Sequence, residues 1–218
     1  MGAITLSLLP LLLLSYLIVR KETNELRSAH KLLASIAATD ALTGIANRYH
    51  LLKQAEVHFS LLRRKRSKFD KEIGMGLIMI DVDHFKQIND RYGHLVGDEV
   101  LILVTKRITQ AVRTYDVFGR YGGEEFLVVL PQAQEHEILD IAHRINRIVA
   151  DDPFELEGLS LNVTVSLGCS WTNAHDEELD VALRRADQNL YDAKQQGRNR
   201  VSYCSIHQNQ QLELTIDS

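Results

Sequence analysis

The stretch Gly76-Leu-Ile-Met-Ile-Asp-Val-Asp-His-Phe-Lys-Gln-Ile-Asn-Asp90 decides the fold, because it joins a short apolar run directly to a polar segment. The run 76–82 is continuous and apolar, which is typical of a strand buried on both faces of a sheet. A short helix is predicted at 85–91, and its first backbone N–H groups could face an anion. Asp81 therefore lies at the carboxyl end of a buried strand, where α/β proteins commonly bind ligands.

Outward from this strand, short apolar runs alternate with segments of helical periodicity. Gly122 and Gly123 join two of these runs in the manner of a hairpin. The run 161–170 alternates apolar and polar residues, as expected for a strand with one buried face. The order of elements predicts an α/β (α+β) domain with a single mixed central sheet flanked by helices. The further strands are expected at 117–121, 125–130, 161–170 and 200–204, and the further helices at 47–65, 97–112, 135–150 and 177–196.

The composition is that of one globular domain with a short appendage. The chain has 218 residues, of which 45% are hydrophobic and 25% charged. Its net charge of −4 argues against nucleic acid as a partner, since nucleic-acid binding usually shows as a basic excess. Cys169 and Cys204 lack the spacing of a zinc site, and their apolar surroundings predict small buried side chains in a reducing compartment.

The first twenty residues differ from the rest of the chain. No charged residue occurs between Ala3 and Val19, whereas Arg20 and Lys21 follow directly. Seventeen residues are at the short end of what spans a bilayer, and Pro10 would kink a helix there. We expect residues 1–20 to anchor the chain in the inner (cytoplasmic) membrane, with the basic flank and the following domain in the cytoplasm. A signal peptide and a buried segment are the alternatives.

Residues 21–39 are predicted to form a linker helix, because they contain neither glycine nor proline. Apolar residues fall on the a and d positions of two heptads, which suits an ordinary amphipathic linker and a parallel two-stranded coiled coil equally well. The main domain is expected at 40–205, and residues 206–218 form a polar tail. The four heptad positions are Leu26, Ala29, Leu33 and Ile36.

Carboxylates follow two of the predicted strands. Asp81 ends the strand 76–82, and Glu124 follows the two glycines of the predicted hairpin. If the two strands are neighbours, these carboxylates converge, and their mutual repulsion would favour a divalent cation such as Mg²⁺, with Mn²⁺ as an alternative. Lys194 and Arg198, near a helix end, could contact a triphosphate. Taken singly, each feature also has a purely structural explanation: a hairpin with solvated carboxylates, a cap, or cations that complement a helix dipole.

Several segments together resemble the GGDEF-domain diguanylate cyclases over residues 40–203. The order and the spacing of the segments agree throughout. Glu124 stands where aspartate is more common in the signature, and Ala46 stands where proline is more common. The matching segments are DALTGIANR at 40–48, DVDHFKQIND at 81–90, GHLVGD at 93–98, RYGGEEF at 120–126, AD at 186–187, LY at 190–191, AK at 193–194 and GRNRV at 197–201.

The resemblance implies a metal site and a catalytic group. Asp81, the carbonyl of Val82 and Glu124 would bind the metal ion, and Glu125 could hold a second ion. Lys86 would stabilise charge on the reacting phosphate. Glu124 could in addition assist deprotonation of the attacking hydroxyl.

The resemblance also implies how the substrate GTP is bound. Asn89 and Asp98 would read the guanine base, with His94 in the same pocket. A carboxylate at Asp98 can accept two N–H bonds from guanine, and adenine offers no matching donors. Products that contain adenine are therefore disfavoured. Lys194 and Arg198 would contact the triphosphate.

The activity implied is the condensation of two GTP molecules into cyclic di-GMP and two pyrophosphates, a nucleotidyl transfer used in second-messenger signalling. Each protomer of a homodimer would hold one GTP. Arg113 and Asp116 resemble the family's inhibitory site, where the product cyclic di-GMP binds. The alternative is a catalytically inactive module that senses cyclic di-GMP or GTP.

Overall fold

The structure, a computed structural model, describes residues 10–23, 38–64, 73–156, 158–172 and 178–204. The chain divides into two compact units, Met1–Ala38 and Thr39–Ser218. The second unit carries every residue that is predicted to bind the metal, the substrate or the product or to take part in catalysis.

In the first unit, residues 10–23 form a helix whose apolar side chains, Leu11 to Leu14 among them, are exposed. None of the helices in the described ranges is both long and apolar enough to cross a bilayer. The described part of the predicted anchor thus gives the membrane prediction no support. Residues 1–9 of that segment lie outside the described residues, as do the four heptad positions of the predicted linker helix and the polar tail.

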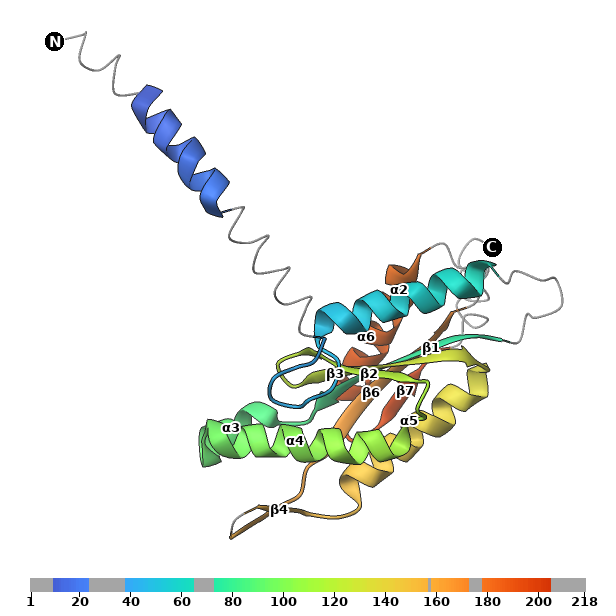
Figure 1. The fold of residues 1–218 in the computed structure, drawn as a ribbon. Coiled ribbons are helices and arrows are strands. Elements are labelled where there is room, and N and C mark those ends of the chain that lie inside the picture. Colours follow the sequence, from blue (N-terminus) through green and yellow to red (C-terminus); the bar gives the residue numbers. More distant parts are fainter. Residues whose placement is uncertain (1–9, 24–37, 65–72, 157, 173–177, 205–218) are drawn as a thin grey trace, which may run out of the picture. The chain divides into compact units, whose positions relative to one another are not determined.

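A mixed five-stranded sheet forms the centre of the second unit (Figure 1). Its strands run in the order β2-β3-β1-β6-β7, and all neighbours are antiparallel except β6 and β7, which are parallel. The predicted mixed sheet is confirmed, and β1 is its middle strand. A separate two-stranded hairpin, β4 and β5, lies outside this sheet. The strands are β1 (Gly74–Val82), β2 (Val117–Gly122), β3 (Glu125–Ala133), β4 (Phe154–Leu156), β5 (Leu159–Leu161), β6 (Val165–Thr172) and β7 (Val201–Tyr203).

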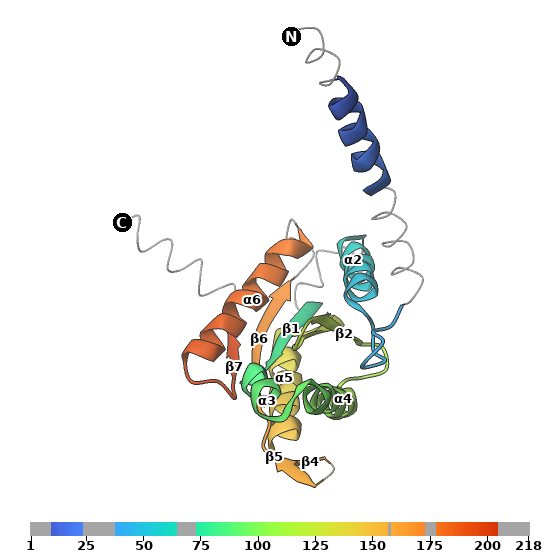
Figure 2. The same ribbon diagram turned by 90° about the vertical axis from the view of Figure 1, so that its left-hand side faces the viewer.

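Helices cover both faces of the sheet, and the view along the strands separates the two layers (Figure 2). The alternate residues Ile78 and Ile80 of β1 pack with α4 and α5, whereas Leu77 and Met79 pack with α2 and α6. Because both faces are covered, all nine residues of β1 are buried. The helices are α2 (Arg48–Arg64), α3 (Phe85–Tyr92), α4 (His94–Ala111), α5 (Glu135–Ala150) and α6 (Leu179–Gln195).

Helix boundaries follow from local capping. The side chain of Asn47 accepts a hydrogen bond of 2.9 Å from the N–H of His50, which fixes the start of α2 as the sequence predicts. α4 begins at His94 rather than at residue 97, because Gly93, with φ of 87°, reverses the chain directly after α3. α3 and α4 are therefore separated by a single residue.

The prediction for 161–170 is wrong in two respects. Residues 159–161 belong to the small hairpin with β4, and the sheet strand β6 begins only at Val165. All eight residues of β6 are buried, so the strand has two buried faces. Its polar residues find partners inside the protein: the Ser170 hydroxyl donates to the carbonyl of Ala182, and the Ser166 hydroxyl donates to Asp83.

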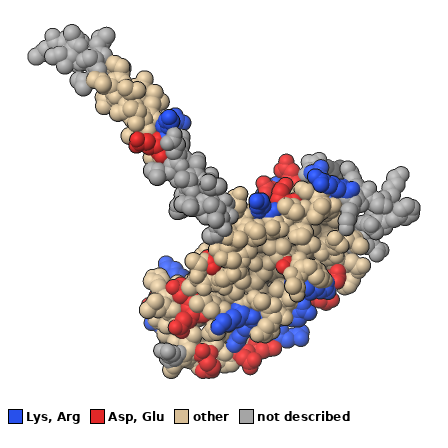
Figure 3. Space-filling model, viewed as in Figure 1, with Lys and Arg blue, Asp and Glu red and all other residues tan. Residues whose placement is uncertain are grey.

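Acidic and basic side chains are interspersed on the face of the second unit that Figure 3 shows. Neither sign of charge forms a continuous area there, and the middle of the face is uncharged. This distribution accords with the small net charge of −4.

Candidate active site

Asp81 lies at the end of the middle strand and is the centre of a cluster of charged groups. Its Cα pairs across the sheet with Glu125 of β3, so that the two side chains share one face. The next residue, Val82, donates its N–H to the carbonyl of Glu124 over 3.3 Å. The ends of β1 and of the β2–β3 hairpin therefore meet, and the predicted convergence of Asp81 with Glu124 is confirmed.

Lys194, in the last turn of α6, adds a positive charge to this cluster. Its Nζ lies 2.8 Å from Oδ2 of Asp81. Burial raises the pKa of Asp81 to about 6; Lys194 opposes this rise, and the charges of Glu124 and Glu125 reinforce it. The Asp81 carboxylate thus pairs with one ammonium group and lies within reach of the charges of two further carboxylates.

The donor set of this cluster fits a hard divalent cation. A buried carboxylate whose pKa is raised by burial and by two neighbouring carboxylates gains from added positive charge. Magnesium usually binds through one or two carboxylates together with substrate phosphates, so a complete protein cage is not required. Within the described residues, no three His, Cys, Asp or Glu side chains are grouped so that they could hold a metal ion by themselves.

Arg120 links the Gly122–Glu124 turn to the start of the domain. The sequence alone did not predict this role. Its Nε donates to the carbonyl of Gly123 over 2.8 Å, and its guanidinium lies 3.2 Å from Oδ1 of Asp40. Burial by itself would raise the pKa of Asp40, but hydrogen bonds from Thr43 and the charge of Arg120 outweigh it and lower the pKa. Arg120 occurs within the quoted RYGGEEF segment, which was the available signal.

Asn89, the predicted guanine reader on α3, faces α4. Its Oδ1 is buried and has no hydrogen-bond partner within the described part of the protein. A Cβ atom on Gly97 would overlap with this oxygen, so glycine at 97 leaves room for the Asn89 amide. The unpaired oxygen is an acceptor that a bound ligand could use.

Four other residues that are predicted to contact the substrate are exposed at the surface. Lys86 on α3 is exposed, as are His94 and Asp98 in the first turns of α4. Arg198 is exposed in the turn between α6 and β7, with a left-handed φ of 62°. The roles predicted for these four residues remain predictions.

Arg113 and Asp116 form a turn of their own between α4 and β2. Oδ2 of Asp116 accepts the N–H of Arg113 over 2.7 Å. The guanidinium of Arg113 donates to the Tyr115 hydroxyl over 2.6 Å and pairs with Glu137 of α5 over 3.2 Å. Tyr115 and Glu137 together raise the pKa of Arg113. The two residues are therefore close together, and Glu137 is an additional partner that the sequence pattern does not reveal.

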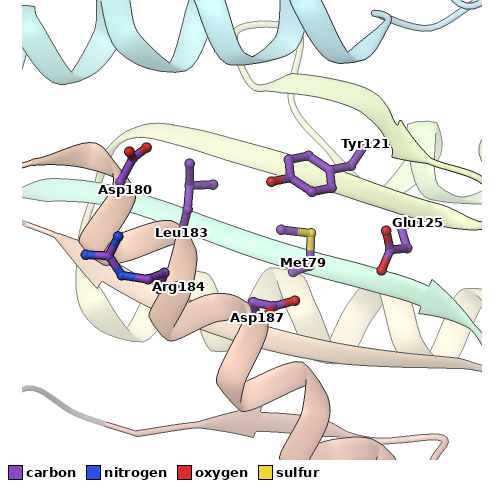
Figure 4. A pocket seen from close by; sticks show the side chains of 7 residues that line it. All are labelled: Met79, Tyr121, Glu125, Asp180, Leu183, Arg184 and Asp187. Atoms are coloured by element: carbon purple, nitrogen blue, oxygen red, sulfur yellow. The ribbon is translucent and has the colours of Figure 1, made fainter.

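A cavity of about 420 Å³ opens between the β2–β3 hairpin and α6. Figure 4 shows Glu125 and Tyr121 on its hairpin side and Met79 of β1 at its base. The guanidinium of Arg48 lies 4.4 Å from the ring centre of Tyr121. Glu125 thus belongs both to the surroundings of Asp81 and to this cavity. The remaining lining residues come from α6: Asp180, Leu183, Arg184 and Asp187.

A mixed sheet between two helix layers, with an acidic cluster at the end of its middle strand, defines the chain as an α/β domain. The profile of the family described as "Diguanylate cyclase, GGDEF domain" matches residues 37–200. The chain belongs to this family, as the sequence motifs predict.

Two curated relatives support the assignment. The response regulator PleD of Caulobacter vibrioides is 39% identical over 184 residues, which cover 84% of this chain and 39% of PleD. Diguanylate cyclase A of Treponema denticola is 36% identical over 170 residues, which cover 78% of this chain and 45% of that protein. The chain thus spans less than half the length of these curated relatives.

Solved structures show the same fold. The active GGEEF domain of a diguanylate cyclase from Vibrio cholerae is 33% identical, with a TM-score of 0.64 over 72% of this chain and 96% of that one. The coiled coil and GGDEF domain of DgcB from Caulobacter crescentus, in complex with c-di-GMP, is 26% identical. It has a TM-score of 0.70 over 85% of this chain and 95% of that one.

Proposed function

We propose that this chain is a diguanylate cyclase, which condenses two GTP molecules into cyclic di-GMP and releases two pyrophosphates. The observation that carries the proposal is the meeting of Asp81 with Glu124 beside Lys194 at the end of the middle strand. This cluster coincides with the GGEEF signature of the family.

Asp81, the carbonyl of Val82 and Glu124 would hold a magnesium ion, and Glu125 could hold a second ion; manganese would suit the same oxygen ligands. Such an ion, when bound, neutralises charge on the phosphates and helps to align the reacting groups. When metal and nucleotide bind, Lys194 would leave its ion pair with Asp81 and contact the triphosphate instead. Asp81 would then be neutralised by the positive charge of the metal ion. Arg198 would contact the same phosphates from the neighbouring turn.

Asn89 and Asp98 would bind the guanine, with His94 nearby. The buried, unpaired Oδ1 of Asn89 supports this, because a buried acceptor without a donor is costly until a ligand supplies one. Lys86, at the start of α3, would stabilise charge on the α-phosphate. Glu124 would assist removal of the proton from the ribose 3′ hydroxyl, whose oxygen attacks the α-phosphate of the other GTP.

Because each domain offers one such site, formation of the cyclic product requires two copies of the chain with their sites facing each other. The predicted linker at 21–39 could bring two copies together. Arg113 and Asp116 would bind the product and so limit activity. Residues 1–20 would hold the enzyme at the cytoplasmic membrane, a proposal that rests on the uncharged segment 3–19 and its basic flank.

The test is incubation of the purified full chain with GTP and Mg²⁺, with measurement of pyrophosphate and identification of the nucleotide product by mass. Formation of cyclic di-GMP with two pyrophosphates per product is expected. A chain that releases no pyrophosphate but binds cyclic di-GMP would instead be the sensor module, and the cyclase proposal would be wrong.

A further inference from the structure

Asp83 lies two residues beyond Asp81, but the protein itself uses both oxygens of its carboxylate. Oδ1 accepts a hydrogen bond of 2.6 Å from the Ser166 hydroxyl, and Oδ2 accepts one of 2.7 Å from the Thr164 hydroxyl. The backbone N–H of Asn199 donates a third bond, of 3.0 Å, to Oδ2. The residue is only 4% exposed. A carboxylate so engaged needs no metal ion to compensate its burial.

The third donor belongs to the turn that carries Arg198, between α6 and β7. Three consecutive residues of this turn have positive φ: Gly197 at 113°, Arg198 at 62° and Asn199 at 46°. For the two residues with side chains this conformation is unfavourable, and it persists only where the surrounding structure imposes it. The turn therefore depends on bonds to the rest of the domain.

Other bonds hold the turn from different sides. The N–H of Arg198 donates to the carbonyl of Ala193 in α6 over 3.0 Å. The side-chain oxygen of Asn199 accepts a bond of 3.0 Å from Asn146 of α5. The bond that Asp83 accepts differs from these, because Asp83 directly follows the strand that ends in Asp81 and Val82. It ties the turn to the chain segment that carries the proposed metal ligands.

We propose that Asp83 is a positioning residue for the triphosphate of the nucleotide. Its hydrogen bond to Asn199 holds the turn 197–200, and with it Arg198, in register with the end of β1. Asp83 acts through the geometry of this bond and contacts neither the metal nor the substrate. The inference rests on the proposed function, since it assumes that Arg198 binds the phosphates of GTP.

The test compares affinities of the full chain for two ligands in the presence of Mg²⁺: a non-hydrolysable GTP analogue and GMP, which lacks the β- and γ-phosphates. Asp83→Ala removes the acceptor for Asn199. Its affinity for the analogue should fall by about tenfold or more, the effect of one charge-assisted contact, while its affinity for GMP changes little. If Asp83→Ala does not fold, Asp83→Ser replaces it, because serine is too short to reach the N–H of Asn199.

Asp83→Asn is the conservative variant. Its amide oxygen can accept from Asn199 while its NH2 group donates to the Ser166 hydroxyl, so both ligands should bind within about threefold of the unmodified chain. Ser170→Ala is the matched control, since it removes a different buried hydroxyl bond, between β6 and α6. Its ratio of analogue to GMP affinity should be unchanged. The double variant Arg198→Ala/Asp83→Ala should bind the analogue as weakly as Arg198→Ala alone, because both substitutions remove the contact between Arg198 and the phosphates.

Two results would overturn the inference. One is an Asp83→Asn variant that binds the analogue as weakly as Asp83→Ala, which would mean that the charge matters rather than the bond. The other is an equal loss of affinity for both ligands in Asp83→Ala, which would show a general structural role. Failure of the unmodified chain to bind the analogue would contradict the proposed function instead.

Discussion

Nζ of Lys194 lies 2.8 Å from Oδ2 of Asp81. The residue that is predicted to bind the triphosphate therefore forms an ion pair with a residue that is predicted to bind the metal ion. The pair joins the last turn of α6 to the end of β1. It partly balances a carboxylate that burial and two acidic neighbours make costly to ionise. In the proposed enzyme, metal and nucleotide binding would separate the pair, because each member then gains its functional partner.

Asp81→Asn should stabilise the metal-free protein at neutral pH. The pKa of Asp81 is raised to about 6 in the folded state, from an ordinary value of 3.8. The stability gained from the protonated carboxyl is therefore present below pH 4 and is lost as the pH rises through 6. The asparagine side chain does not ionise, so the variant keeps its stability as the pH rises. The free energy of unfolding of the variant should therefore exceed that of the unmodified chain by near zero at pH 4 and by about 1–2 kcal/mol at pH 8, after allowance for partial exposure of Asp81. Urea unfolding in EDTA measures this difference.

Added Mg²⁺ gives the control for this prediction. Metal binding to the folded state should raise the melting temperature of the unmodified chain but leave that of Asp81→Asn unchanged. The effect on the unmodified chain should also weaken below about pH 6, where protons compete for Asp81. Equal metal responses in both proteins would remove Asp81 from the proposed metal site.

Glu124→Gln should strongly reduce turnover while the fold is retained. The residue lies in the turn between β2 and β3 and is only partly buried, so an amide of the same shape is tolerated there. The loss of a charged ligand should lower kcat by about a hundredfold or more, since metal-bound charge stabilisation amounts to several kcal/mol. Pyrophosphate release and circular dichroism test the two parts. A variant with normal kcat would show that Glu124 is not in the site.

Most of the fold could be predicted from the chain because local signals were strong. The continuous run of β1, the Asn47 cap and the two glycines of the hairpin each correspond to an observed element. The second buried face of β6 could not be predicted, because Ser166 and Ser170 look solvent-exposed in an alternating pattern. Their partners, Asp83 and the carbonyl of Ala182, exist only in the folded chain.

The candidate site shows the same division. Asp81 and Glu124 could be expected to meet as soon as their strands were assumed to be neighbours. The bond between Asp83 and Asn199 spans 116 positions, and the pair of Arg120 with Asp40 spans 80. Single-chain patterns carry no register for such distant contacts, so the contacts that support the candidate site could not be predicted.

Gly97→Ala should weaken GTP binding without unfolding the domain. The added methyl group would overlap with Oδ1 of Asn89 and come within 3.2 Å of the Phe85 ring, so the Asn89 amide, at the end of its side chain, must move. Alanine favours a helix over glycine by up to about 1 kcal/mol, so the melting temperature should stay the same or rise. KM for GTP should increase about tenfold, the effect of one lost hydrogen bond to the base.

Asn89→Ala is the reference variant for this change. Because both substitutions act on the Asn89 amide, the double variant should bind GTP no more weakly than Asn89→Ala alone. Affinities from isothermal titration complete this cycle. Additive losses would mean that Gly97 affects the nucleotide by a route that does not involve Asn89.

Glu137→Gln should strengthen inhibition by the product. Glu137 pairs with the Arg113 guanidinium over 3.2 Å and so competes with any anion that Arg113 would bind. Its other bond, from the N–H of Gln134, forms part of the capping box of α5, and glutamine can keep this bond. Arg113 then loses a charged partner, so the concentration of cyclic di-GMP that halves the initial rate should fall several-fold. Arg113→Ala should raise that concentration instead, since the guanidinium suited to phosphate and guanine is removed. If both variants are inhibited like the unmodified chain, the product binds elsewhere.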